Sequence, residues 1–264
     1  MATETVTGAH EPVAPLHVSP RGMGVGDSSW RNLQKLGGAT ALIAILLAPA
    51  EIAISSVPSV ERATAQTVTV IDWFNLLQKH WFVALRNLGL LNIVGAALLI
   101  PTILAVYSLL WREHEAYATL GAALFFLGTA IYLANSKAFP MLWLSRQYMV
   151  AGEAQRALLA AAGQTMLAEG QSRAGILVIE FACLVLSVVM LKSEVFSKAT
   201  GCAGVLANTL MMVVEIAFMP PIGVGMIIAA AGGLSLMTWY FLMGCRLLKL
   251  GATVREQAHG RTPD

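Results

Sequence analysis

Charged side chains are scarce in this sequence. Asp, Glu, Lys and Arg together make up 12% of the 264 residues, whereas hydrophobic residues make up 57% and the mean hydropathy is +0.69. A soluble globular domain carries about 25% charged residues, so this balance is typical of a membrane protein. The formal net charge is only +2, and the basic residues are scattered between apolar runs rather than gathered in a patch. The sequence therefore argues against nucleic acid as a partner.

Residues that commonly carry enzyme chemistry are also few. The three cysteines, Cys183, Cys202 and Cys245, each lie in an apolar run and lack the paired spacing of a disulfide framework or a zinc site. The five histidines are dispersed, and the sequence has no HExxH motif. Gly201 to Gly204 is glycine-rich but lacks the Lys that phosphate binding needs. We therefore expect a protein that is not an enzyme and that holds no cofactor or metal.

What the sequence does contain is long apolar runs. Leu88 to Trp111 has no charged side chain. At about 1.5 Å per residue this run spans roughly 36 Å as a helix, enough to cross the ~30 Å hydrocarbon core of a bilayer. Its end carries Tyr107, Trp111 and Arg112, an aromatic and basic pattern that suits a membrane interface. The run predicts a transmembrane helix.

Further runs of this kind predict an all-α, polytopic membrane protein with a bundle of six transmembrane helices. The connection at 112–115 is so short that the spans on either side of it should form an antiparallel hairpin. Pro49 and Glu51 interrupt the first span, which we interpret as retained although Ala63-Thr64-Ala65 resembles a peptidase site. The expected spans cover residues 38–57, 88–111, 117–135, 174–191, 199–219 and 222–245.

Two tails and two long connections flank these spans. Residues 1–36 are expected to form a disordered cytoplasmic tail, residues 37–250 the transmembrane domain, and residues 251–264 a second cytoplasmic tail. Each long external loop is expected to carry one amphipathic helix. The first, within 61–86, suits either the membrane interface or a cap packed over the bundle, and the pattern leaves both open. The second covers residues 153–169.

Lys and Arg near the span ends predict the orientation of the chain. Most of them lie in the tails and the short connections of one side, whereas the others sit on the two long loops, where charge is a poor guide to topology. This bias predicts a multi-pass protein of the plasma (inner) membrane with both termini in the cytoplasm. The residues on the cytoplasmic side are Arg21, Arg31, Lys35, Arg112, Lys192, Lys198, Arg246, Lys249, Arg255 and Arg261.

Small residues recur at every fourth position in the last two spans. Such stripes let helix backbones approach closely, because lipid gives helices no hydrophobic reason to associate. They predict helix packing, either within one chain or between two chains. The residues are Ala199, Ala203 and Ala207 in one span and Gly225, Ala229 and Gly233 in the other.

Polar residues inside the spans are the candidate functional residues. They fall at one depth, toward the outer side, and they are Glu51, Asn92, Asn135, Lys137, Glu180 and Glu215. An ionised side chain at mid-bilayer costs on the order of 3 kcal/mol or more. One interpretation is structural: each Glu is neutral or reaches water, and Lys137 extends to the interface. The other is an outward-facing polar cavity, in which repulsion keeps a proton on at least one carboxyl and Lys137 or a bound cation offsets the rest.

Several short stretches resemble an uncharacterised prokaryotic membrane family, the domain of unknown function 4386 group. The resemblance covers most of the chain beyond the first span, and it implies a six-span fold without carrying over a catalytic residue. The stretches are Leu91-Asn92, Pro101 to Leu110, Tyr132 to Asn135, Leu144-Ser145 with Tyr148, Gln155-Arg156 with Leu159 and Gly163, Val189 to Leu191, and Arg246 to Gly251.

Two functional classes follow from these observations. The first is a non-enzymatic structural or partner-binding bundle, surrounded by membrane lipids and associated with another membrane protein or with a second copy of itself. The alternative is a small transporter or a proton- or cation-linked protein that binds a small molecule or ion in an outward-facing polar cavity. The first predicts that the intramembrane carboxyls are buried or lipid-adjacent, and the second predicts that they reach water.

Overall fold

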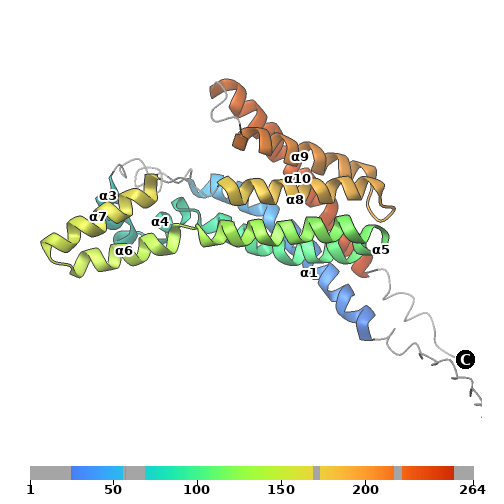
Figure 1. Ribbon diagram of the computed structural model, residues 1–264, viewed down its shortest axis with the longest axis horizontal. Helices are drawn as coiled ribbons and strands as arrows, with labels where there is room; N and C mark the ends of the chain where they lie inside the picture. Colours follow the sequence, from blue (N-terminus) through green and yellow to red (C-terminus); the bar gives the residue numbers. More distant parts are fainter. Residues whose placement is uncertain (1–24, 56, 58–68, 169–172, 217–221, 253–264) are drawn as a thin grey trace, which may run out of the picture.

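The computed structural model describes residues 25–55, 57, 69–168, 173–216 and 222–252; most of these residues are helical, and none of them forms a strand. Figure 1 shows a bundle of long helices with a group of shorter ones at one end. In chain order the helices are α1 (Val25–Ser55), α3 (Val70–Lys79), α4 (Trp81–Asn87), α5 (Leu90–Ala134), α6 (Ala138–Val150), α7 (Glu153–Ala168), α8 (Arg173–Lys192), α9 (Lys198–Ile216) and α10 (Ile222–Ala252).

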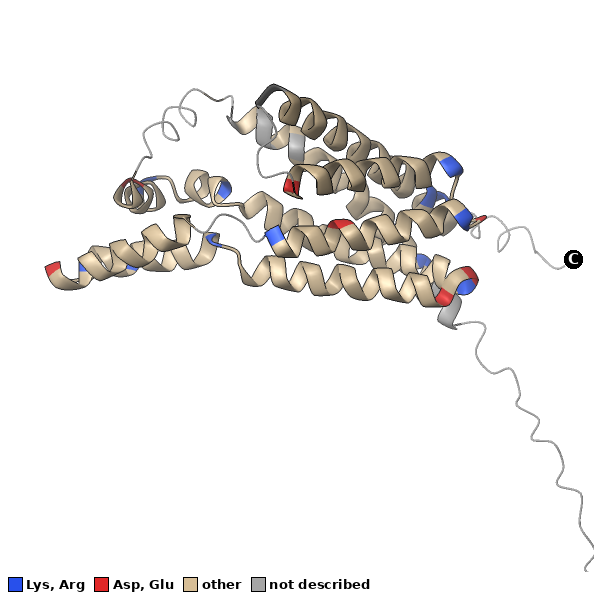
Figure 2. Ribbon diagram, turned by 45° about the horizontal axis from the view of Figure 1, so that its top comes forward, with Lys and Arg blue, Asp and Glu red and all other residues tan. Residues whose placement is uncertain are grey.

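Four helical stretches of the described chain are long and apolar enough to cross a membrane, which agrees with a membrane protein. They are Leu90–Val150, Glu153–Lys192, Lys198–Ile216 and Val224–Ala252. Figure 2 shows the charged residues mostly near helix ends, with the middle of the long helices nearly free of them. This distribution keeps most charges out of the region that a hydrocarbon core would occupy.

The longest helix, α5, folds back on itself. His114 has non-helical dihedral angles (φ −142°, ψ 60°), and the helix reverses there into two arms that run side by side (Figure 1). We call residues 90–113 the first arm and residues 115–134 the second arm. This is the hairpin that the short connection at 112–115 predicts.

The long helices form a ring in which neighbours in sequence pack together. α1 packs on α5, α5 on α8, α8 on α9, α9 on α10, and α10 returns to α1. Gly37 of α1 contacts Thr102 in the first arm, whereas Gly128 in the second arm contacts Ile179 of α8. The two arms therefore hold different neighbours.

Glycines allow the closest approaches between these helices. A methyl group at Gly38 of α1 would lie 2.9 Å from the carbonyl oxygen of Gly244 on α10, and one at Gly201 of α9 would lie 3.0 Å from the backbone nitrogen of Leu191. Contacts this short leave no room for a side chain. Helix packing in this bundle thus depends on glycines that the four-residue stripes did not single out.

Only some residues of the two predicted small-residue stripes pack against neighbouring helices. On α9, Ala207 is fully buried and Ala203 is half-buried, but Ala199 is exposed. On α10, Gly225 and Ala229 are half-buried, and a methyl group at Gly233 would meet nothing within 4 Å. Its neighbour Gly232 makes the contact instead, with Met211 and Leu210 of α9. Within this chain Gly233 therefore makes no close helix contact, because adjacent glycines face different sides of a helix, and the alternative of packing between two chains stays a prediction.

A small polar network joins α1 to the first arm of α5. The Thr102 hydroxyl donates to the Gly37 carbonyl at 2.9 Å and lies 3.0 Å from the Thr40 hydroxyl. Thr40 also donates to the carbonyls of Leu36 and Gly37. Both hydroxyls are buried and satisfied, as interhelical polar contacts in lipid must be.

The shorter helices α3, α4, α6 and α7 form an end cluster with its own hydrophobic core. Phe74 and Leu77 of α3 pack with Met141 of α6, and Gly163 of α7 lies against Phe74. A capping box between Thr69 and Asp72 begins α3. The helix pattern expected through 61–86 is broken at His80, which separates α3 from α4, and Trp81 beyond it is 59% exposed.

The first helix is longer than its expected span. α1 begins at Val25, before the predicted start at residue 38, so part of the segment expected to be disordered within 1–36 is helical. Gly37 and Gly38 both contact neighbouring helices, and these contacts hold the preceding turns in register. The rest of the expected tails, residues 1–24 and 253–264, lies outside the described residues.

Candidate ligand cavity

Between the helices of the ring lies a partly open cavity of about 380 Å³. Residues from α1, both arms of α5, α8, α9 and α10 line it, and most of them are apolar. Binding pockets for small molecules commonly enclose about 300 to 1,000 Å³ and combine apolar walls with a few polar groups. The volume and the lining both fall within that description.

Glu180 of α8 is the most unusual side chain of this cavity. It is 7% exposed, and its Oε2 has no hydrogen-bond partner among the described residues. Ile176, Ile179 and Cys183 line the cavity with it, at the three- and four-residue steps that place side chains on one face of a helix. A buried carboxyl oxygen without a partner is costly, so this group needs an explanation.

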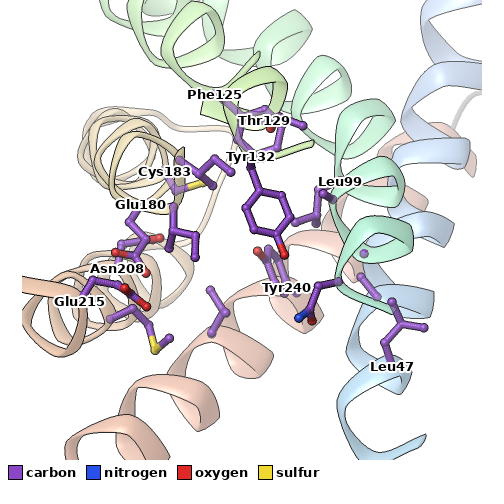
Figure 3. A pocket seen from close by; sticks show the side chains of 18 of the residues that line it. Leu47, Leu99, Phe125, Thr129, Tyr132, Glu180, Cys183, Asn208, Glu215 and Tyr240 are labelled. Atoms are coloured by element: carbon purple, nitrogen blue, oxygen red, sulfur yellow. The ribbon is translucent and has the colours of Figure 1, made fainter. Parts of the chain in front are cut away.

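A second carboxyl, that of Glu215, faces the cavity from α9. Glu215 is half-buried and follows Asn208 and Met211 on the same helical face. Asn208 is buried and donates from Nδ2 to the Gly204 carbonyl at 2.7 Å, which leaves its amide oxygen as an acceptor. Figure 3 shows Glu180, Asn208 and Glu215 together on the side formed by α8 and α9.

The opposite wall carries hydroxyl and aromatic groups. Phe125, Thr129 and Tyr132 follow one another on one face of the second arm of α5, and Tyr132 extends into the cavity (Figure 3). The Thr129 hydroxyl is 3% exposed and, among the described residues, has no hydrogen-bond partner. Tyr240 contributes a second phenol from α10. Two residues that line this cavity, one on α5 and one on α8, thus each carry a buried polar atom without a partner among the described residues.

The wall between α1 and α10 explains how this space arises. These two helices approach closely at Gly38 against Gly244 and at Lys35 against Gly251. Farther along, Ala44 and Leu47 of α1 and Leu236 and Tyr240 of α10 line the cavity. The helices therefore meet at one end of the bundle and leave room between them toward the other.

The structure brings together only part of the predicted polar cavity. Asn92, Glu180 and Glu215 line the same cavity. Asn135 and Lys137 instead border a separate cavity of about 30 Å³, because α5 ends at Ala134 and the chain turns there toward the end cluster. The expectation that Lys137 lies in the main cavity with the carboxyls is not met. The side chain of Glu51 lies outside the described residues.

Sequence analysis did not identify four polar residues that line the cavity: Thr129, Tyr132, Asn208 and Tyr240. Tyr132 borders both the main cavity and the small one near Lys137. Only a helical projection of the apolar runs gives a signal for them, since Thr129 and Tyr132 share a face with Phe125. Threonine and tyrosine are common in membrane helices, so such a signal is weak without the fold.

A second cavity lies at the other end of the ring, where the α5 arms turn. It encloses about 480 Å³ and is bordered by Trp30, Arg31, Tyr107, Trp111 and Arg112, among others. Aromatic and basic residues of this kind are typical of a membrane interface. Within the part of the chain that the structure describes, no group of three or more His, Cys, Asp or Glu side chains is placed to hold a metal ion.

Comparisons with known proteins find no matching family model, no matching curated protein and no matching solved structure. The cavity and its residues are therefore the basis for any statement about function.

Proposed function

We propose that this protein crosses the plasma membrane six times, with both termini in the cytoplasm. The six spans are α1, the two arms of α5, α8, α9 and α10. The ring supports this count, because each of these segments packs beside the next and together they line one cavity. In this arrangement the turn at His114 and the α8–α9 connection face the cytoplasm, and the end cluster faces outward. We also propose that the protein is related to the domain of unknown function 4386 group, which implies the same six-span fold.

We further propose that the cavity binds a small molecule from the outside and that binding is linked to a proton or cation. One observation carries this proposal: the Glu180 carboxyl, with an unpartnered oxygen, borders a cavity of about 380 Å³ that Glu215 also faces. Intramembrane carboxyls are expensive and usually mark ligand or proton pathways. A bound ligand or cation would supply the partner that Oε2 lacks.

The geometry favours this reading over a purely structural bundle. A structural role predicts carboxyls that are buried or lipid-adjacent, and the burial of Glu180 taken alone agrees with it; what that role does not explain is a buried carboxyl oxygen without a described partner in the lining of a cavity. Glu180 is 7% exposed and lines a cavity, while Thr129 on the facing helix also has an unpartnered hydroxyl among the described residues. Packing alone would favour apolar side chains at both positions.

Thiol labelling tests this proposal. In a background free of native cysteines, Met211→Cys places a thiol in the cavity wall, and Leu206→Cys places one on the same helix at a position that is 53% exposed and faces away from the cavity. A membrane-impermeant thiol reagent is added to intact cells. We expect labelling at position 211 and none at position 206, because the reactive thiolate forms in water and not in lipid.

Two results would contradict the proposal. Absence of labelling at position 211 in a normally folded variant would leave only the packing interpretation. Labelling at position 206 would show that this face of α9 meets water, and the proposed membrane placement would then be wrong.

A further inference from the structure

We infer that the ligand of this cavity is an amphipathic organic amine, bound as a cation in exchange for a proton held by the Glu180–Glu215 pair. This inference rests on the proposed function and names the chemical class of the ligand. It follows from the charge of the lining, from its apolar and aromatic surface, and from the unpartnered oxygen atoms that point to a missing donor.

The charged groups of the cavity have one sign. The titratable side chains that face Glu180 are Cys183 on its own helix, Tyr132 of α5, Glu215 of α9 and Tyr240 of α10, whereas the described lining residues of α1 are apolar. Among the described lining residues there is no Lys, Arg or His. The cavity therefore favours a cation and disfavours an anion, which would meet two acidic groups without a counter-charge.

The rest of the surface fits an apolar body attached to that cation. Leu47, Leu99, Ile176 and Met211 offer hydrocarbon and thioether surface from four different segments of the ring. A small inorganic cation would leave this surface and most of the 380 Å³ unused. The phenol rings of Tyr132 and Tyr240 add π faces, which attract organic ammonium groups when water is excluded.

The hydrogen-bonding groups also match an ammonium. A primary ammonium carries three N–H donors and no acceptor, and the same inventory holds for Lys. Glu180, Thr129 and Asn208 line the cavity; the Glu180 Oε2 and the Thr129 hydroxyl oxygen have no described partner, and the Asn208 amide oxygen is an acceptor. A purely acceptor ligand would leave the ionised form of Glu180 unsatisfied, whereas an ammonium satisfies it.

The two carboxyls explain the coupling to a proton. With no basic side chain in the described lining, the empty cavity cannot hold two ionised carboxyls at low cost, so one of them keeps its proton. When an ammonium ion binds, its charge stabilises the ionised form, and that proton leaves to solution. One positive charge enters and one leaves, so the net charge of the site is unchanged.

Three probes with the same skeleton test the ligand class: 4-phenylbutylamine, 4-phenylbutan-1-ol and 4-phenylbutyrate, which are cationic, neutral and anionic at neutral pH. Binding to the full-length protein in lipid nanodiscs is measured by equilibrium dialysis. We expect the amine to bind at least tenfold more tightly than the other two. In weakly buffered solution, amine binding should release up to about one proton per ligand, and its affinity should rise with pH below the range in which the amine itself deprotonates.

Matched Glu→Gln variants test which carboxyl is responsible for amine binding and proton release. Glu180→Gln should weaken amine binding at least tenfold and abolish proton release, while the affinity for the alcohol changes little. Glu215→Gln is the second variant, and because Glu215 is only half-buried we expect this change to perturb folding less than Glu180→Gln. Glu115→Gln, in the exposed turn at the far end of the ring, is the control and should behave as the unmodified protein.

Each contrary result would overturn one specific part of this inference. Failure of the amine to bind, or binding of the alcohol or carboxylate with equal affinity, overturns the amine assignment. Amine binding without proton release, or unchanged by both cavity variants, overturns the exchange. The labelling of Met211→Cys decides separately whether the proposed cavity stands, so the two failures are distinguishable.

Discussion

Gly128 and Gly175 face each other where the second arm of α5 meets α8. A methyl group on Gly128 would lie 3.0 Å from the Gly175 carbonyl oxygen, and one on Gly175 would lie 3.1 Å from the Gly128 carbonyl oxygen. The contact is reciprocal and involves backbone on both sides, so neither helix can yield by moving a side chain. This crossing holds Thr129 and Glu180 on the two walls of the cavity.

We expect Gly175→Ala to destabilise the protein by about 1 to 3 kcal/mol, because the added methyl group would force the two backbones apart. Gly233→Ala is the matched control: it lies in a helix and has open space around it, so it should be neutral or stabilise by up to about 1 kcal/mol. Reversible unfolding in mixed micelles, followed by tryptophan fluorescence, measures both. Equal effects at the two positions would show that the close contact is absent in the membrane.

Two threonines of α5 should respond differently to replacement by valine. Thr102→Val removes the hydrogen bond to Gly37 and should cost about 1 kcal/mol. Thr129→Val removes a buried hydroxyl without a described partner, so stability should be unchanged or rise by about 1 kcal/mol. The same unfolding experiment applies. A large loss of stability from Thr129→Val would mean that this hydroxyl has a structural partner in the folded protein.

The proposed orientation predicts opposite accessibility at the two ends of the ring. Gly152 lies in an exposed connection of the end cluster, and Glu113 is exposed at the turn of α5. In a cysteine-free background, an impermeant maleimide should label Gly152→Cys in intact cells and should label Glu113→Cys only after the cells are opened. Reporter fusions at Asp264 and within 153–168 should likewise give opposite signals. Matching signals would show that a span has been miscounted.

The three cysteines should form no disulfide within the chain. All are free thiols on three different helices: Cys183 is buried in α8, Cys202 is exposed on α9, and Cys245 is half-buried in α10. We expect the monomer to migrate identically on gels with and without reductant. A shift in its mobility on reduction would contradict this arrangement.

The long helices follow from the sequence because length and hydrophobicity act locally. The hairpin at His114 was predictable for the same reason, since the short connection leaves the chain no other path. The packing contacts could not be predicted in this way. Gly232 and Gly233 are adjacent in α10 and differ only in the direction in which each faces around the helix axis. Which of the two touches α9 depends on the whole ring.

The site was predictable only as a set of polar residues at similar depth. That argument found Glu180, Glu215 and Asn92, since unsatisfied polar groups stand out in an apolar helix. It also included Lys137, which depth alone cannot separate from them, because the chain turns away at the end of α5. Thr129 and Tyr240 could not be found in this way, since their polarity is ordinary and only the ring places them around one space.

The order of helices in the ring has a consequence for how this protein is made. In the proposed membrane arrangement, each newly inserted helix finds its main packing partner already in place, immediately before it in the chain. The contact between α1 and α10 is different, because it can form only after α10 has been synthesised and inserted. Since Leu236 and Tyr240 of α10 complete the wall, the acidic face of α8 stays open to its surroundings until that last docking step. Under the proposed function, biosynthesis therefore ends by completing the cavity, and a chain that stalls before α10 lacks one of its walls.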